Sequence, residues 1–354
     1  KMLDENIAEL YSLGYFRIIY YEIISIGKDQ VNLVINVQEA QLRKFNLGLK
    51  WDNFYDLIGV ANIQLNSQFI PGLKIENEVQ FAGIQKNIFS IYYPSRKLNF
   101  PVYPFLRATN MRYPIKNYFI NKNPESYLFT TSNFQTGIGI LLKNYWSTES
   151  SYFIKKDNLV EENTNNKQSD TYTGIKLNAQ LDLIDDVLFP WNGILIKSQY
   201  EKSDKEWRST KNYDFYSFYG DFYITKNKNT FRFMSYYHNA TNDIPHYKLI
   251  SYGGSKSFVG LQEFQLWGKS LFFTRTEYRY KHKKDIFLHL IFNYLLNAKA
   301  DNSISTKNIG SFGLGITLLS PLGPMEFIWS KGPKDIYQNQ NLQNLFYFSA
   351  GYNF

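Results

Sequence analysis

The last ten residues of the chain, Leu345–Phe354 (LFYFSAGYNF), decide the fold class. One face of this stretch carries the larger apolar side chains, which are Phe346, Phe348, Ala350, Tyr352 and Phe354. The other face carries Tyr347, Ser349, Gly351 and Asn353. Alternation with a period of two indicates a β-strand, and an apolar face opposite a polar one suits a strand between lipid and a wet lumen. The stretch therefore predicts a membrane-spanning strand.

The same alternation recurs upstream in segments of about 9 to 13 residues, the length of a strand that crosses a bilayer. The clear examples are Lys44–Trp51, Ile58–Phe69, Ile75–Gly83, Phe134–Lys143, Tyr172–Leu183, Gly193–Glu201, Tyr213–Thr225, Asn229–Asn239, Ser270–Lys281, Ile286–Leu296, Ile309–Leu319, Met325–Lys331 and Leu345–Phe354. Tight turns at 71–72, 226–228, 283–285 and 321–324 alternate with long polar loops at 158–170, 202–212 and 241–268. This pattern is typical of a transmembrane barrel, with short turns in the periplasm and long loops outside.

The spacing of these segments predicts the number of strands. At roughly 19 residues for a strand and its connection, residues 43–354 hold about 16 strands. Five of them follow the loop near 241–268 and eleven precede it. The pattern leaves the count within 96–131 open by one or two strands. The expected fold is an all-β transmembrane protein, an antiparallel barrel of about 16 strands.

Composition agrees with a barrel and excludes several other classes. The 354 residues include 29 Tyr, 29 Phe and 6 Trp, and there is no Cys, which removes disulfides and thiolate zinc sites. The formal net charge is +8, but Lys and Arg are spread along the chain, so we expect no nucleic-acid partner. A soluble all-β sandwich is the alternative. The length and number of the strands, the aromatic content and the terminal Phe argue against it.

The first 42 residues follow a different pattern. Leu3, Ile7, Leu10 and Leu13 recur at helical spacing, and Gly14 stands where a glycine would end the helix. Two strands follow, over 15–23 and 31–37, separated by a turn at 27–29. One helix and a hairpin are too small to fold well alone. We therefore expect a partial α/β module over 1–42, further chain before it, and a barrel over 43–354.

The order of several motifs resembles the BamA/TamA/FhaC superfamily of outer-membrane barrels, whose members carry periplasmic POTRA domains. Residues 10–16, the strand over 31–37 and Glu39 resemble the second half of a POTRA domain. Residues 181–193 resemble the hairpin motif D-x-x-D…F-P-x-x-G of the family, with Asp182, Asp185, Pro190 and Gly193 at the motif positions. Phe348, Tyr352 and Phe354 resemble the C-terminal signal that the barrel assembly machinery recognises. The resemblance covers almost the whole chain.

The sixth extracellular loop of the family resembles residues 253–261. The residues that match this lumenal loop motif are Gly253, Gly254, Phe258, Val259, Gly260 and Leu261. The resemblance implies that this loop folds into the lumen, where its glycines let the backbone approach the wall. Two positions depart from the family. Val259 stands where the family has an Arg, and Asn293 stands where its partner Asp would lie.

These departures favour one branch of the family, the patatin-type phospholipase autotransporters of type Vd secretion. That resemblance implies a barrel in the outer-membrane lipid that anchors or translocates a covalently linked N-terminal passenger, with the POTRA module in the periplasm. The alternatives are a BamA/TamA-like assembly factor and a two-partner secretion transporter. An assembly factor should have a weak seam between the first strand and 345–354, where the sequence shows Gly351 and no other weakness.

The residues show no catalytic or cofactor site. A patatin site needs a Gly-x-Ser-x-Gly elbow, and the nearest match, Gly253–Ser257, ends in Ser; no Asp is followed by Gly. The four His form no ligand motif, and His238 has no evident residue to orient it. Asp182, Asp185 and Asp186 suit capping of a hairpin better than calcium. We therefore expect no enzyme, cofactor or metal in these residues, with any lipase domain upstream.

Overall fold

A computed structural model describes most of the chain. The described residues are 16–27, 30–39, 43–67, 73–93, 102–117, 125–142, 145–161, 166–186, 189–241, 249–299, 308–321, 323–334 and 341–351, with 3, 7, 70, 164, 243 and 244 between them. Most of the helix predicted over 3–13 lies outside this set. Tyr352 and Phe354 of the predicted C-terminal signal also lie outside it.

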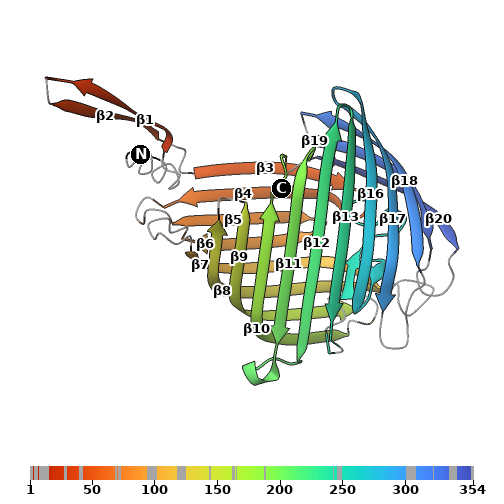
Figure 1. Ribbon diagram of the computed structural model, residues 1–354. Coiled ribbons are helices and arrows are strands. Elements are labelled where there is room, and N and C mark those ends of the chain that lie inside the picture. The colour runs from red at the N-terminus through yellow and green to blue at the C-terminus, as the bar shows by residue number, and fades with distance from the viewer. Residues whose placement is uncertain are drawn as a thin grey trace.

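Two N-terminal strands form an antiparallel hairpin. They are β1 (Phe16–Ser25) and β2 (Val31–Glu39), and they match the two strands predicted from the sequence. The hairpin stands apart from the barrel wall, near the start of β3 (Figure 1). The division of the chain at residue 42 stays a prediction.

The wall begins with eleven strands. They are β3 (Arg43–Asp52), β4 (Asp56–Asn66), β5 (Lys74–Ala82), β6 (Gln85–Tyr92), β7 (Val102–Asn117), β8 (Glu125–Leu142), β9 (Trp146–Glu161), β10 (Lys167–Asp182), β11 (Gly193–Ser203), β12 (Tyr213–Lys226) and β13 (Asn229–Ala240). A short 3₁₀ helix, η1 (Lys205–Trp207), lies between β11 and β12. Two short strands, β14 (Ile250–Tyr252) and β15 (Leu266–Trp267), pair with each other in the long connection after β13.

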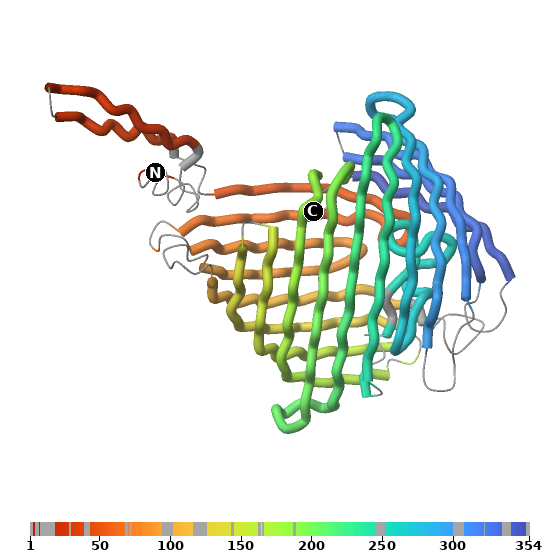
Figure 2. Tube along the Cα trace, viewed as in Figure 1, coloured from red at the N-terminus to blue at the C-terminus, as the bar shows by residue number. Residues whose placement is uncertain are grey.

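Five more strands complete the wall. They are β16 (Ser270–Lys283), β17 (Ile286–Lys299), β18 (Ile309–Ser320), β19 (Gly323–Pro333) and β20 (Leu342–Gly351). The sixteen described wall strands pair in sequence order, β20 pairs with β3, and the sheet closes. Figure 2 follows the chain around the wall from orange β3 to blue β20. This confirms the predicted sixteen-stranded antiparallel barrel, with eleven strands before the long loop and five after it.

The sequence pattern missed three strands and shortened others. β6, β7 and β9 are absent from the clear segments, and the loop predicted over 158–170 is wrong. β9 continues to Glu161 and β10 starts at Lys167, and Lys167 pairs with Val160. These strand ends carry charged and amide side chains, as in Asn158, Glu161 and Gln168, so the hydropathy alternation fades while the backbone ladder continues.

Inside and outside are distinguished most clearly on β17. Phe287, His289, Ile291, Asn293 and Leu295 are buried, and each residue between them, from Leu288 to Tyr294, is exposed and is Leu, Phe or Tyr. The barrel therefore has an apolar outer face and packs its core inward. Among the described residues, no helix is both long and apolar enough to cross a membrane.

Parity places the connections. Antiparallel strands alternate in direction, so successive connections between wall strands lie at opposite ends of the barrel. The chain leaves one end after β3, β5 and each second wall strand from there, and it leaves the other end after β4, β6 and the remaining wall strands, with β16 following β13 in the wall. The turns at 227–228 and 284–285 share an end with the start of β3 and the end of β20. The β3–β4 turn at 53–55, η1 and the long connection after β13 lie at the opposite end.

Candidate functional site

The contact between β20 and β3, called the seam below, is the shortest ladder of the wall among the described residues. It holds three described residue pairs: Ser349 with Asp52, Ala350 with Trp51 and Gly351 with Lys50. Other neighbouring strands share from seven described pairs, for β5 and β6, to sixteen, for β7 and β8. Because each backbone hydrogen bond contributes about 1 kcal/mol net, the described pairs of the seam hold its two strands together less strongly than those of any other ladder in the wall.

Two strand edges meet the seam without a ladder partner. In the described part of the chain, residues 43–49 of β3 pair only with β4, and 342–348 of β20 pair only with β19. The amide of Asn53 donates to the Phe346 carbonyl at 3.0 Å, which caps one group of the free β20 edge. Such an edge is a template for another strand.

Glycine allows the close approach at the seam. Gly351 has a φ of +113°, and a Cβ there would lie 2.1 Å from the carbonyl oxygen of Leu49. The sequence indicated Gly351 as the one weak position of the last strand. The low pair count itself was not visible in the sequence.

The two faces of β20 lie as its alternation predicted. Phe346 is 71% exposed on the outer face, and the ring of Phe348 contacts Trp51 of β3 and Phe327 of β19 at 5.1 and 4.4 Å. Tyr347 points inward and reaches the loop described next. Phe348 is thus the one member of the predicted C-terminal signal that lies among the described residues.

The lumenal loop, residues 253–268, lies inside the barrel against β16 to β20. Phe258, Val259 and Leu261 are fully buried, and Phe258 packs on Phe273 of β16 with ring centroids 5.6 Å apart. The Val259 carbonyl accepts hydrogen bonds from Ser311 at 2.5 Å and Asn293 at 3.4 Å. The two departures from the family motif therefore make a neutral contact with each other.

Gly260 is the point of closest approach between the lumenal loop and the wall. Its φ is +89°, and a Cβ there would lie 2.9 Å from Cα of Gly332 on β19. Its N–H donates to the Tyr347 hydroxyl at 2.8 Å, and that hydroxyl donates to the Leu261 carbonyl at 2.8 Å. The loop is thereby joined to β20.

Gly253 and Gly254 close the base of the same loop. The Gly253 N–H donates to Ser257 Oγ at 2.9 Å, and the Gly254 N–H donates to the Leu261 carbonyl at 2.9 Å. Both glycines have positive φ, +146° and +76°. The six predicted loop residues thus lie together on the inner face of the barrel.

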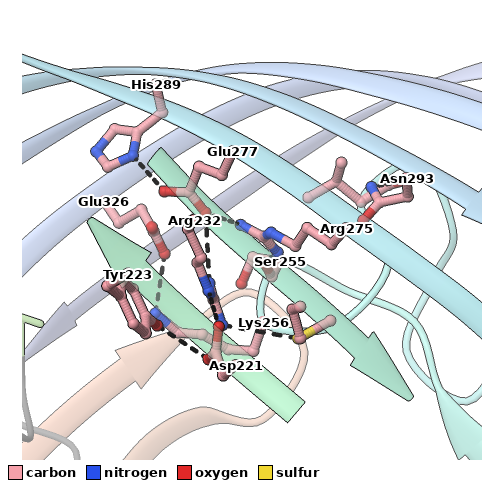
Figure 3. A network of polar contacts seen from close by, with 12 residues as sticks. Asp221, Tyr223, Arg232, Ser255, Lys256, Arg275, Glu277, His289, Asn293 and Glu326 are labelled. Carbon is pink, nitrogen blue, oxygen red and sulfur yellow. Dashed lines mark hydrogen bonds and ion pairs between the residues drawn. The ribbon is translucent and has the colours of Figure 1, made fainter. Parts of the chain in front are cut away.

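A network of charged side chains on the inner face of the wall binds the loop (Figure 3). Arg275 of β16 donates to the Ser255 carbonyl at 2.6 Å and pairs with Glu277 at 2.9 Å. Lys256 of the loop pairs with Glu326 of β19 at 2.9 Å. Charged contacts to the loop therefore come from Arg275 and Lys256, and neither residue stands at the position of the family's motif Arg, which is Val259 here.

The network continues behind Glu277. Arg232 of β13 bridges Glu277 at 3.3 Å and Asp221 of β12 at 2.8 Å, and His289 Nδ1 lies 2.8 Å from Glu277. Buried charges are tolerable because each is paired. The motifs found in the sequence did not point to this group. Its signal was charge recurring every second residue on the inward face, as in Arg275, Glu277 and Arg279.

The loop leaves the opposite part of the lumen open. A cavity of about 910 Å³ lies along the inner faces of β7 to β13 and is bounded by Tyr252. Four cations line it, Arg107, Lys155, Lys176 and Lys197, together with the carboxylates Glu149 and Glu201. Arg107 pairs with Glu149 at 3.2 Å and Lys155 with Glu201 at 3.6 Å. The lining is therefore polar and net positive.

The predicted hairpin motif caps the turn between β10 and β11. Asp185 accepts the N–H groups of Trp191 and Asn192 at 2.8 and 3.0 Å. Desolvation raises its pKa, but these N–H donors outweigh that effect and hold the pKa of Asp185 below its usual range. Asp182 accepts from Ile184 at 3.4 Å. Gly193 has a φ of +119°, and a Cβ there would meet the Leu183 carbonyl oxygen.

The same turn folds under the barrel. The Pro190 carbonyl accepts a hydrogen bond from Arg279 of β16, whose guanidinium lies 3.9 Å from the ring centroid of Phe189. Phe189 and Trp191 both contact the buried ring of Phe287, at 4.7 and 5.3 Å. The turn thus partly covers the lumen at the end where the wall starts and finishes.

The remaining candidates have structural surroundings. His238 is buried, with Nε2 2.7 Å from the Gly268 carbonyl oxygen. Asp186 accepts the Phe189 N–H at 2.8 Å, so the three aspartates of the turn all serve as hydrogen-bond acceptors there. Within the described ranges, no group of three or more His, Cys, Asp or Glu side chains is placed to hold a metal ion.

A family model described as the Omp85 superfamily domain matches residues 78–354. No curated protein matches the sequence. Among solved structures, the chain is similar to BamA from Haemophilus ducreyi lacking POTRA domains 1–3, with 14% identity and a TM-score of 0.77, over 99% of this chain and 77% of that one.

Two further solved structures are similar to the chain. CdiB from Acinetobacter baumannii has 12% identity and a TM-score of 0.60, over 97% of this chain and 67% of that one. CdiB from Escherichia coli has 9% identity and a TM-score of 0.58, over 99% and 71%. At these identities, the three likenesses show a shared fold.

Proposed function

The chain belongs to the Omp85 superfamily, and from this premise we propose that it is an assembly factor that passes client β-strands into the membrane through its β3–β20 seam. Membership of this superfamily points to the bacterial outer membrane and supports a general role in protein transport. We propose that the barrel itself catalyses no reaction. The finer role rests on one observation. The seam has three described residue pairs, where other neighbouring strands have at least seven.

The edges at the seam suit an incoming strand. In hydrocarbon each unsatisfied backbone group costs several kcal/mol, so a free edge favours pairing with another strand. Residues 43–49 of β3 have no described partner on the seam side, and they present Phe45, Leu47 and Leu49 to the outside, each more than 60% exposed. A client strand with the same alternation would match this edge on both faces.

We also propose the domain arrangement and partners that the sequence suggested. Residues 1–42 form a partial POTRA-like module in the periplasm, supported by the β1–β2 hairpin beside the start of β3. The barrel over 43–354 contacts outer-membrane lipid along its apolar outer face. The barrel assembly machinery recognises its last strand through Phe348, Tyr352 and Phe354.

Anchoring or translocation of a covalently linked N-terminal passenger, such as a patatin-like lipase, is the second candidate. One observation favours it over two-partner secretion. Val259 and Asn293 meet through a neutral hydrogen bond at 3.4 Å, without the ion pair that the family resemblance implies. The sequence favoured this passenger role. We rank it second to strand insertion because of the short described ladder at the seam.

Insertion is tested by locking the seam. Because the chain contains no Cys, the pair Trp51→Cys and Ala350→Cys introduces a single disulfide across the seam. In proteoliposomes, the reduced double variant should speed the folding of a urea-unfolded outer-membrane barrel, and oxidation should abolish that effect. The matched control is Phe218→Cys with Tyr237→Cys, which lock the well-paired β12 and β13. Undiminished client folding with the seam locked would refute insertion through it.

The passenger role is tested by sizing the native protein. An antibody to the barrel should detect the protein in outer-membrane extracts, and the same band is assayed for phospholipase activity. A band tens of kilodaltons larger with lipase activity supports the passenger anchor. A larger band that lacks lipase activity counts against a lipase passenger.

A further inference from the structure

We propose that the lumenal loop is a latch that holds the seam closed by binding both of its sides, with Phe264 and Tyr347 as its two positioning residues. This inference rests on the proposed role of the seam. The three described backbone pairs of the seam are then only part of its closure, and the rest comes from the side chains of one loop.

The first side of the latch is β20. Tyr347 accepts from the Gly260 N–H and donates to the Leu261 carbonyl, both at 2.8 Å. Gln343, also on β20, donates to Gln265 of the loop at 3.3 Å. Two inward side chains of the last strand are therefore bound to the loop.

The second side is the turn that follows β3. The ring of Phe264, on the loop, contacts Phe54 at 5.7 Å with the planes 74° apart. It also stacks on Tyr113 of β7 at 6.1 Å and 24°. The turn itself is ordered, because Asp52 accepts the N–H groups of Phe54 and Tyr55 at 3.1 and 2.8 Å. Phe264 thus ties the loop to the strands that follow the seam.

A pocket of about 320 Å³ lies between these two attachments. Lys50 and Asp52 of β3, Lys256 and Glu263 of the loop, and Ser349 of β20 are among its lining residues. The loop therefore faces both seam strands across one pocket. An outward movement of β20 would have to break the loop's contacts with either Tyr347 or Phe54.

The backbone conformation at Phe264 is strained, as expected for a residue that holds the latch in place. Its φ is +60°, the left-handed region, which a bulky residue rarely adopts. Strained residues of this kind persist only where surrounding contacts enforce them, and they gather at switches and clamps. Contacts with Phe54 and Tyr113 hold this ring.

The test measures seam opening directly, without a client. Spin labels on the outward residues Leu49→Cys of β3 and Phe346→Cys of β20 report the seam distance in proteoliposomes. Phe264→Ala should raise the population of long distances about two- to twelvefold, which corresponds to loss of an aromatic contact worth roughly 0.5–1.5 kcal/mol. Phe264→Tyr keeps the ring and should restore the wild-type distribution.

A double-variant cycle separates a latch from general destabilisation. A bridge fails when either end fails, so Phe264→Ala, Tyr347→Phe and the combined variant should open the seam to similar extents. Additive effects, or an unchanged distance distribution in Phe264→Ala, would refute the latch. Heat-modifiability on gels verifies that each variant keeps the barrel. Open-seam variants that fold clients no differently would count against the proposed function while leaving the latch intact.

Discussion

Gly260 shows how one residue sets the position of the lumenal loop. Its positive φ and the 2.9 Å that a Cβ would have to Gly332 leave no room for a side chain. The sequence suggested this glycine through a motif, and the structure supplies the reason, which is a second glycine on β19. The partner could not be predicted because it lies 72 positions further on, in a strand whose register depends on the strands between.

Gly260→Ala should displace the loop. The left-handed backbone costs an L-residue roughly 1–2 kcal/mol, and the contact with Gly332 adds to it. We expect faster trypsin cleavage at Lys256 and a lower thermal midpoint. Gly310→Ala on β18 is the control, since the nearest atom to its Cβ would be 4.0 Å away. Equal behaviour of the two variants would contradict this account.

Glu263 should make the hold of the loop depend on pH. It shares a pocket with Asp52, Lys50 and Lys256. Desolvation and the charge of Asp52 raise the pKa of Glu263 to about 7, although Lys50 lowers it. A released loop would titrate near the ordinary value of 4.5. Glu263 therefore holds its proton up to a higher pH in the bound loop than in the released loop. The binding of the loop is most stable below about pH 4.5 and weakens as the pH rises to about 7.

Protease protection of the loop, measured from pH 4 to 8, tests this sign. Protection should fall between about pH 4.5 and 7 and change little above that range. Glu263→Gln should remove the slope, because an amide does not titrate. A wild-type slope in Glu263→Gln would assign the pH dependence to another group.

At the scale of elements, the inward faces of the strands carry the wall charges. Arg275 and Lys256 both hold the loop, but their burial differs: 3% of the Arg275 side chain is exposed and 57% of the Lys256 side chain. An exposed pair contributes about 0–1 kcal/mol, whereas removing one partner of a buried pair costs about 3–5 kcal/mol. The wall, rather than the loop, should therefore supply most of the electrostatic hold.

Arg275→Met and Lys256→Met test this difference. The first leaves Glu277 buried with fewer partners and should lower stability by about 3 kcal/mol or more. The second should cost less than about 1 kcal/mol. Urea unfolding in lipid vesicles measures both. Equal losses would mean that the Lys256–Glu326 pair matters more than its exposure indicates.

The strands themselves were largely predictable. Alternation found thirteen of the sixteen, because lipid on one side and a packed lumen on the other impose a period of two. It failed on β6, β7 and β9, where polar side chains interrupt the apolar outer face, as the exposed Asn87 does on β6 and the exposed Asn110 does on β7. Backbone pairing continues there without a hydropathy signal.

At the scale of the molecule, the number of wall strands is even. The start of β3 and the end of β20 therefore lie at the same end of the barrel. The short described ladder of the seam could not be predicted from the sequence, since the pairing of the first and last strands follows from every register between them. Motifs such as Gly253–Leu261 indicated a lumenal loop. They did not indicate Phe264, whose role depends on where the β3–β4 turn lies.

Epitope tags test the sidedness that parity assigns. A tag inserted at 208–211, after η1, should bind antibody on intact cells, and a tag at 227–228 should bind only after the outer membrane is opened. Both insertions lie in connections of the wall, so loss of folding is checked by heat-modifiability. Surface exposure of the second tag alone would invert the orientation.

The position of the seam has a consequence for how the barrel tolerates insertions. Each ladder sets the offset of the next strand, so fifteen offsets accumulate before β20 meets β3. One extra residue in any wall strand that no bulge absorbs would reach the seam as a slip of one, which turns Phe348 inward and Tyr347 toward lipid. The pairing between β3 and β20 therefore depends on the summed register offsets of all the other ladders in the wall. Small length changes far around the wall should be tolerated locally and detected as faulty closure there.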